Sequence, residues 1–559
     1  MSYQRLNSPH RHGPGWPLLA VLTAGVIILV AAFFVFTDPF GGSGDDPAVT
    51  KYTEAEVGQP SRVNPLFAYA SDVDRDLASL VFSGLVRLDA DGTPKPDLAE
   101  SWDVSDDGLT VTYHLRANVT WHTGAPFTSN DVIFTYALLS DPKLQADPEQ
   151  AALWQSVKCL ARDTLTVACT LPEPYAPFVT YATMGILPST ILGSGTTAAS
   201  ILDDPFNRHP VGTGPYSVVA LDNTHALLRA NKSFYLGVPH IDEITFKFYP
   251  DVASAAADIV RSQADGLLAD LTINPADFRT LHDVDGLTEH PSDRSAFTIL
   301  YLNDGAPPMN DPAVRGAIAR AVDIDSIISS LLGGRAQRAD TPIVPGTWAF
   351  SSDAGTINHD VGQARTLLDN DGWTLPSGAS VRQKNNQELR ISLITDQDAL
   401  RGAIADAISQ QLGEAGIDAT VVRQPSNDLV RESLIPRQYQ AAIFGWDPGA
   451  DPDPYPAWHS SQTINNGRNI SGYTSDDADK LLEEARRTFK LDARKLLYND
   501  FQKLFLKDLP SIPLYVPLYT YFVSDRVSGV DPGVLFSPSS RFRNVWEWTV
   551  TTPANIGGN

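Results

Sequence analysis

The densest group of chemically capable side chains is a proline-rich acidic segment, WDPGADPDPYPAW, at residues 446–458. It begins with Trp446 and contains Asp447, Asp451 and Asp453. Two carboxylates at a suitable separation can serve as the acid and base of a glycosidase. Asp also serves as a turn and capping residue in such loops, and an uncompensated carboxylate beside aromatic rings attracts a ligand cation. We rank cation binding above capping for at least one of the three, and catalysis well below both.

Other enzyme signals are absent from the sequence. It contains no G-x-S-x-G, no H-E-x-x-H, no G-x-x-x-x-G-K-[ST] and no G-x-G-x-x-G that opens a helix. The eleven His are scattered; His122 and His459 each follow a Trp, where packing is a commoner role than metal binding. We therefore predict no catalytic residue, no metal site and no cofactor.

The two cysteines, Cys159 and Cys169, are too few for a disulfide scaffold or a Cys-rich metal site. The surrounding VKCLARDTLTVACTL is typical of two short strands around a turn. In an oxidising compartment a cross-strand disulfide is expected, and two free buried thiols are the alternative.

The compartment is indicated by an apolar run near the start, LLAVLTAGVIILVAAFFVF at 18–36, which is long enough to cross a hydrocarbon core of about 30 Å. Arg5 and Arg11 precede the run and Asp38 follows it, so the positive-inside rule places the body outside the cytoplasm. The run exceeds the usual length for a cleaved signal peptide, and its end lacks an A-x-A-like site.

We therefore predict a single-pass protein of the cell membrane with an extracytoplasmic body. Residues 1–17 would form a cytoplasmic tail, 18–37 an uncleaved transmembrane signal anchor, and 38–50 a linker that includes the flexible GGSGDDP. A cleaved signal peptide is the alternative.

The amino-acid composition limits the classes of molecule that the extracytoplasmic body can bind. The chain has 559 residues, of which 43% are hydrophobic, so it can bury a large core. Its formal net charge of −24 argues against nucleic acid and anionic lipid, because phosphate binding needs basic patches.

Strands and helices alternate along the body, which predicts an α/β fold. The segment 390–424 is typical of a strand, a helix and a second strand, the crossover unit of an α/β lobe. A helix is predicted from Asp311 to about Leu332. The aromatic run 512–524 predicts either a strand pair or one strand broken by Pro517.

Several blocks, in order, resemble one family. VNPLFAYASDVDRDLASLVFSGLVRLDADGTPKPDLAESW opens the body, and NVTWHTGAPFTSNDVIFTY at 118–136 is similar to the family's most characteristic signature. LPEPYAPF, VGTGPYSV, PPMNDPAVRGAIARAVDID, the FGW loop and LPSIPLYVPLY follow. Together they resemble the extracytoplasmic solute-binding proteins of peptide/nickel-type ABC importers, family 5, from residue 51 to about 550.

The resemblance implies a type II, two-lobed periplasmic-binding-protein-like fold with an extra subdomain. Lobe I would span 51–295 with an insertion at about 90–207, lobe II would span 296–520, and 521–559 would return to lobe I and form the tail. It also implies a non-catalytic receptor that encloses a small solute, preferably an oligopeptide, and delivers it to ABC permease and ATPase subunits. The alternatives are a sensory ectodomain that acts through a partner chain and an anchored hydrolase that uses the loop carboxylates.

The resemblance implies ligand contacts from three segments. They are Tyr69, Ala70 and Ser71; Tyr301 and Asn303; and Gly445, Trp446, Asp447 and Asp451. In the family's peptide binders an Asp three residues beyond the Trp pairs with the ligand's α-amino group. Gly449 holds that position here, so Asp447 and Asp451, which flank it, are the candidate substitutes.

Overall fold

The computed structural model describes residues 49–144, 147–464 and 466–551. The predicted cytoplasmic tail, transmembrane anchor and nearly all of the linker lie outside these ranges. Within them, no helix combines the length and apolar character needed to cross a membrane.

A long mixed sheet with strand order β18-β17-β19-β13-β20-β11-β1-β10-β9-β8 organises the chain. We call the part built on the following strands lobe I: β1 (Lys51–Val57), β8 (Tyr216–Leu221), β9 (His225–Ala230), β10 (Glu243–Tyr249), β11 (Gly266–Ala269) and β12 (Leu287–Asp293). Lobe II is built on β13 (Phe297–Leu302), β14 (Ala336–Arg338), β17 (Arg390–Asp396), β18 (Asp418–Gln424) and β19 (Ala441–Trp446). Both parts have their own apolar cores.

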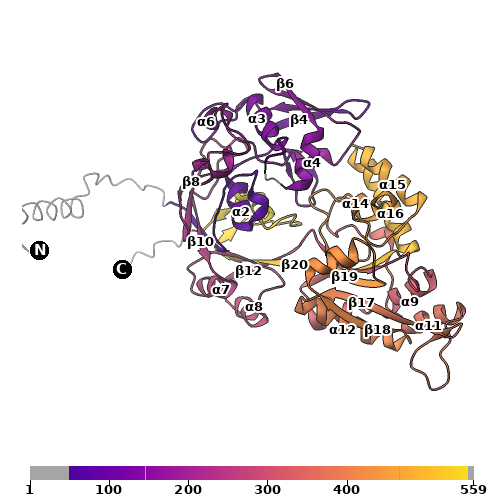
Figure 1. The fold of residues 1–559 in the computed structure, drawn as a ribbon. Coiled ribbons are helices and arrows are strands. Elements are labelled where there is room, and N and C mark those ends of the chain that lie inside the picture. Colours follow the sequence, from indigo (N-terminus) through magenta and orange to yellow (C-terminus); the bar gives the residue numbers. More distant parts are fainter. Residues whose placement is uncertain (1–48, 145–146, 465, 552–559) are drawn as a thin grey trace, which may run out of the picture. The chain divides into compact units, whose positions relative to one another are not determined.

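One strand, β20 (Ser511–Ser524), belongs to both lobes and runs between them in Figure 1. Its second half pairs with β12 and β11, and its first half pairs with β13. The strands β12 and β13 are separated only by residues 294–296, so the chain crosses between the lobes at two adjacent places. Two adjacent crossings are the geometry of a hinge.

Pro517 does not break β20. It stands opposite Ala336 of β14, and its carbonyl accepts a hydrogen bond from the Arg294 N–H at 3.0 Å. The aromatic run therefore forms one continuous strand, and the expectation of a broken strand or a strand pair is wrong.

Helices cover the sheet of each lobe (Figure 1). In lobe I they are α2 (Asp72–Val81), α7 (Val252–Val260) and α8 (Pro275–His282). In lobe II they include α9 (Pro312–Ala321), α10 (Ile324–Leu331), α11 (Val361–Asn370), α12 (Ala399–Glu414), α14 (Tyr455–Trp458), α15 (Asp476–Arg487) and α16 (Leu491–Asp508). The single helix predicted from Asp311 is two helices, because the Asp323 carboxylate accepts from the Ser326 N–H and starts a new one.

A separate antiparallel sheet forms a small unit beside lobe I, the subdomain, drawn with α3 and α4 in Figure 1. Its strands, in order, are β4 (Ala99–Val104), β5 (Thr110–Leu115), β7 (Thr166–Thr170) and β6 (Lys158–Asp163); its helices include α3 (Ser129–Leu139) and α4 (Pro148–Ser156).

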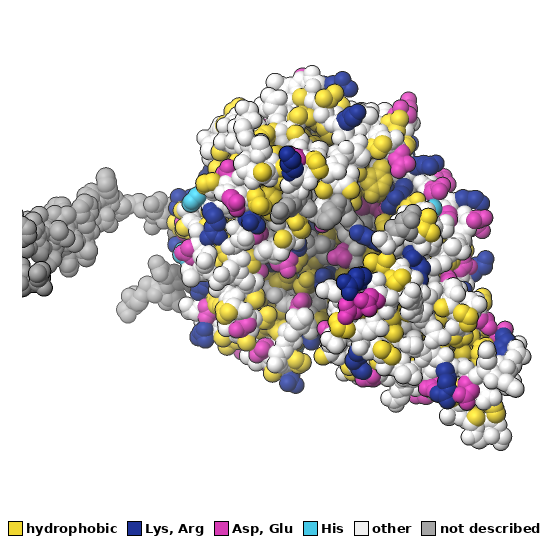
Figure 2. Space-filling model, viewed as in Figure 1, with side chains coloured by type: hydrophobic (Ala, Val, Ile, Leu, Met, Phe, Trp, Pro, Cys, Tyr) yellow, Lys and Arg dark blue, Asp and Glu magenta, His cyan; other side chains and the backbone are white. Residues whose placement is uncertain are grey.

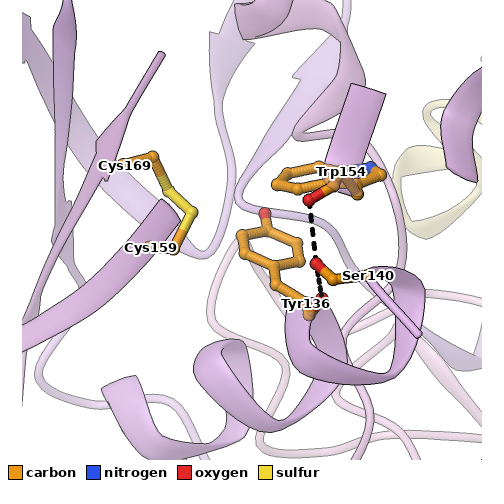
Figure 3. The surroundings of a disulfide bond; sticks show 5 residues. All are labelled: Tyr136, Ser140, Trp154, Cys159 and Cys169. Atoms are coloured by element: carbon orange, nitrogen blue, oxygen red, sulfur yellow. Dashed lines mark hydrogen bonds between the residues drawn. A yellow bond between two sulfur atoms is a disulfide. The ribbon is translucent and has the colours of Figure 1, made fainter. Parts of the chain in front are cut away.

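A disulfide joins Cys159 of β6 to Cys169 of β7, which stand opposite each other (Figure 3). Nearby, the rings of Tyr136 and Trp154 stack at 4.0 Å, and the Ser140 hydroxyl lies 2.8 Å from the carbonyl oxygens of both residues. The disulfide and the stacked rings thus hold the strands and helices of the subdomain together.

Lobe I is held together by a buried charge cluster around Arg541, which follows β20 in the chain. Its guanidinium contacts Glu54 at 2.8 Å, Glu56 at 2.9 Å and Asp76 at 2.5 Å. The Tyr521 hydroxyl donates to Glu54 at 2.8 Å. Burial raises the pKa of Glu54 and Asp76, and the charge of Arg541 opposes that rise. The one cation therefore contacts three carboxyl groups that come from β1 and α2, and burial together with the charge of Asp76 raises the pKa of Glu56 well above its usual value.

Replacing Arg541 with Met should destabilise lobe I severely. The change removes the cation and leaves buried carboxylates uncompensated, which costs about 3–5 kcal/mol. Thermal unfolding followed by circular dichroism measures the loss. Arg390→Met is the matched control, because Arg390 is an exposed ion-pair partner of Glu388 and such pairs contribute about 0–1 kcal/mol. Equal decreases in the unfolding temperature of the two variants would contradict the proposed contribution of the Arg541 cluster to stability.

Candidate ligand-binding cleft

Three adjoining pockets lie along the facing surfaces of the lobes and the subdomain. The hinge pocket (≈ 500 Å³) lies between Asp270–Thr272 and Tyr519 on one side and Arg401 and Phe444 on the other. The loop pocket (≈ 760 Å³) lies between the subdomain and the segment 446–468. The lobe I pocket (≈ 430 Å³) lies beside α2 and the segment 534–546.

Shared walls connect these pockets into one cleft. Trp446 and Asp447 line both the hinge pocket and the loop pocket. Met184 and Ala450 line both the loop pocket and the lobe I pocket. Each pocket falls in the size range of about 300–1,000 Å³ that is typical of small-molecule sites.

The indole of Trp446 is positioned by other rings at the end of β19. It stacks on Phe297 at 5.6 Å and meets Trp458 edge-on at 6.4 Å. Because Trp446 remains half-buried and lines two pockets, packing holds it as part of the cleft wall. Gly445 lines the hinge pocket beside it.

Asp447 presents a carboxylate that is not used by the fold. Its Oδ1 accepts the Gly449 N–H at 2.8 Å, and among the described residues no cation lies within ion-pair distance. Desolvation raises the pKa of Asp447, and Gly449, Arg294 and Arg75 oppose the rise. A ligand cation in the cleft would meet this carboxylate directly.

The other two carboxylates of the loop are committed to ion pairs. Asp451 binds the buried guanidinium of Arg494 through both oxygens, at 2.8 and 2.6 Å. Asp453 binds Arg486 at 2.7 Å. These pairs anchor the loop, so Asp451 lines the loop pocket as a structural group and Asp447 is the uncommitted carboxylate of the three.

The subdomain touches lobe II across the loop pocket. Thr180 donates to Asp451 at 3.3 Å, and the Ala176 N–H donates to the Arg486 carbonyl at 2.6 Å. The Arg486 guanidinium lies over Tyr455 at 3.7 Å and over Tyr175 at 5.4 Å. Subdomain and lobe II therefore meet along one side of the cleft.

The segment Tyr69–Ser71 contributes one side chain to the cleft. Tyr69 is 39% exposed and lines the lobe I pocket, and Arg75 holds its carbonyl at 2.6 Å. Ser71 instead caps α2 by accepting the Asp74 N–H. Neither Ala70 nor Ser71 lines any of the three pockets.

Tyr301 and Asn303 are not brought to the cleft. Tyr301 is 4% exposed and stacks on Trp458, and the Asn303 amide donates to the carbonyls of Arg437 and Tyr439 at 2.8 and 2.7 Å. The reason is that β13 lies between β19 and β20 and is buried on both faces. Their contacts hold lobe II together.

Sequence reasoning missed several residues of the cleft wall. They are Arg87, Tyr175, Tyr181, Met184, Arg294, Ser537 and Ser539. Tyr175 lies in the LPEPYAPF block, which marked the segment without marking its role. Arg87 likewise lies in the opening block, which did not mark its role. The others come from distant parts of the chain and carry no local pattern.

No His or Cys lines these three pockets, and among the described residues no group of three His, Cys, Asp or Glu has the geometry to hold a metal ion. The described cleft therefore offers aromatic rings, guanidinium groups and carboxylates for recognition. Among its described residues, Asp270 and Asp398 of the hinge pocket, like Asp447, accept local hydrogen bonds and form no ion pair.

Comparison with known proteins identifies the family. The model described as "Bacterial extracellular solute-binding proteins, family 5 Middle" matches residues 93–467. The oligopeptide-binding protein AppA of Bacillus subtilis is 26% identical, over 88% of this chain and 90% of its own length. The nickel-binding periplasmic protein of Escherichia coli is 29% identical, over 83% and 88% respectively.

The fold agrees with these sequence matches. The structure of NikZ from Campylobacter jejuni in complex with Ni(L-His) matches 89% of this chain and 99% of its own, with a TM-score of 0.66 and 27% identity. A strand shared by two lobes, a cleft between them and a family match over most of the body lead to one conclusion. The chain belongs to the bacterial extracellular solute-binding proteins of family 5.

Proposed function

We propose that this solute-binding receptor of an ABC importer takes oligopeptides and holds their amino end at Asp447. The observation that carries the proposal is the uncommitted carboxylate of Asp447, in a cleft wall shared by two pockets and beside the indole of Trp446. A carboxylate in a partly desolvated site binds an ammonium group more strongly than one in water.

The walls of the cleft suit a peptide. Tyr69, Tyr175 and Tyr181 combine apolar faces with hydroxyl groups, so they accept varied side chains. The matched relatives are named for oligopeptides and for nickel. The absence of His and Cys from the described walls favours the peptide, since imidazole and thiolate are the side chains that ligate nickel well.

Hydrolysis is a weaker alternative. A glycosidase-type mechanism needs two working carboxylates, and two of the three loop carboxylates are held by Arg494 and Arg486. A solute that touches both lobes, by contrast, has the differential affinity for the closed state that hinge closure requires.

The lobe bounds predicted from the sequence, 51–295 and 296–520 with a return from 521, remain our proposal, as does the subdomain at about 90–207. The pairing of β20 with both β12 and β13 supports them. ABC permease and ATPase subunits are the partners that we propose.

Asp447→Asn should weaken peptide binding by at least tenfold, because it removes the anionic partner of the ligand's amino group. The loss should equal that caused in the native chain by acetylating the peptide's amino terminus. Isothermal titration with matched free-amine and acetylated peptides measures both effects.

The pH dependence supplies an independent check. Burial raises the pKa of Asp447, so the carboxylate is protonated at a higher pH than usual and affinity for free-amine peptides should fall as the pH drops through that range. Asp447→Asn should be insensitive over the same range. Unchanged affinity in Asp447→Asn would refute the role of Asp447.

Asp451→Asn should affect stability more than recognition. It leaves the buried guanidinium of Arg494 with a neutral partner, and breaking a buried pair costs about 3–5 kcal/mol. Asp447→Asn removes no ion pair and should leave the unfolding temperature nearly unchanged. Thermal unfolding of both variants tests the contrast. Equal unfolding temperatures would contradict our assignment of Asp451 to a stabilising ion pair and of Asp447 to ligand binding.

We also propose that residues 18–37 anchor the receptor in the cell membrane. The support is the uncharged apolar run itself and the basic residues before it. The full chain should sediment with membranes and resist extraction by high salt and alkaline carbonate, whereas a chain that begins at residue 48 should stay in the supernatant. Release of the full chain by carbonate would rule the anchor out.

A further inference from the structure

The lobe I pocket contains a guanidinium group that the fold leaves without an acceptor. Arg87 belongs to the short strand β2 (Val86–Leu88) and lines the pocket. Its Nε is buried without a hydrogen-bond partner, and among the described residues its guanidinium forms no ion pair. The guanidinium carbon of Arg87 lies 5.9 Å from the centroid of the Trp546 ring.

The other charged groups beside this pocket are already paired. Arg75 binds Asp72 at 2.7 Å. Arg543 contacts Asp89 at 3.4 Å and Asp531 more closely.

The charge of Arg87 acts to lower the pKa of two carboxylates of the pocket wall, Asp89 and Asp97. Asp89 is paired with Lys95 and Arg543, which leaves Asp97. It accepts the Tyr235 hydroxyl, and burial raises its pKa to about 6. Among the described residues, neither carboxylate forms an ion pair with Arg87, although both interact with its charge over a longer distance. The guanidinium of Arg87 thus has no direct acceptor in the described fold, and an unpaired guanidinium in a partly buried site is costly.

The rest of the wall fits a carboxylate on an apolar chain. The hydroxyls of Ser537 and Ser539 lie 2.8 Å apart and supply further donors. Met184, Phe536 and Phe542 add apolar surface. A guanidinium matches a carboxylate with two parallel hydrogen bonds.

We infer that the lobe I pocket is a carboxylate subsite with Arg87 as its specificity-determining residue. The inference rests on the proposed function. Ala450 borders both the loop pocket and the lobe I pocket, three residues beyond Asp447, so one ligand can reach both charged groups. The solute is therefore dipolar: an ammonium at Asp447 and a carboxylate, such as a peptide's free carboxyl terminus, at Arg87.

The first test compares peptides of three to six residues whose carboxyl termini are either free or amidated. With the full chain in detergent, free-acid peptides should bind at least tenfold more tightly by titration calorimetry. Arg87→Gln should abolish that preference and Arg87→Lys should restore part of it. Arg279→Gln, an equal charge change at an exposed position on α8, should change nothing. The subsite is overturned if the native chain does not prefer free-acid over amidated peptides, or if Arg87→Gln keeps that preference.

A second test does not depend on peptides. Fluorine NMR should show binding of 4-fluorobenzoate at millimolar concentration, no binding of 4-fluorobenzamide, and loss of the benzoate signal change in Arg87→Gln but not in Arg279→Gln, whose exposed position lies outside the three pockets. Benzoate binding that depends on Arg87, without any peptide binding, would keep the subsite and overturn the peptide assignment. Peptide binding without a preference for the free acid would keep the peptide assignment and overturn the subsite. Absence of both overturns the subsite.

Discussion

A single buried guanidinium, that of Arg541, determines how lobe I closes. It compensates Glu54 and Glu56 of the first strand and Asp76 of α2, although it stands almost at the end of the described chain. Because the buried carboxyl groups of Glu54 and Asp76 need the cation of Arg541, lobe I is incomplete until the chain has built lobe II and returned along β20. The hinge and the two-lobed form follow from this connection.

The same cluster sets the walls of the cleft. The turn that contains Arg541, Pro538–Phe542, carries Ser539, and α2 is preceded by the turn that carries Tyr69. A movement at the charge cluster would displace both walls of the lobe I pocket. Ion pairs within the fold thus position the charged groups and rings that face the cleft. The loop at 446–458 shows the same arrangement, because two of its carboxylates form ion pairs that anchor the loop and the third, Asp447, faces the cleft.

Much of this arrangement could be predicted from the sequence where the signal is local. The α/β alternation, the disulfide strands and the Trp446–Asp447 loop follow from contiguous motifs, and the two-lobed form is what the family resemblance implies. The break between α9 and α10 was missed because a short cap at Asp323 outweighs an otherwise continuous apolar pattern. Tyr301 and Asn303 were expected at the cleft, but burial on both faces of β13 is decided by strands far away in the chain. The opening family block contains Arg87 without marking its role, since what distinguishes Arg87 is the lack of an ion-pair partner in the described structure.

The two charged residues that we assign to the ends of the ligand, Asp447 and Arg87, lie on opposite lobes, and this bears on closure. Asp447 follows β19 of lobe II, whereas Arg87 lies on β2, whose neighbouring Val86 belongs to the apolar core on the lobe I side. A solute that carries only one charge satisfies one lobe and gains little from the approach of the other. A dipolar solute binds both, so its differential affinity for the closed form includes both charge pairs. Recognition of the ligand's two ends and closure of the hinge are then the same physical event, and the distance between the two charges at closure limits the length of the solute that the receptor accepts.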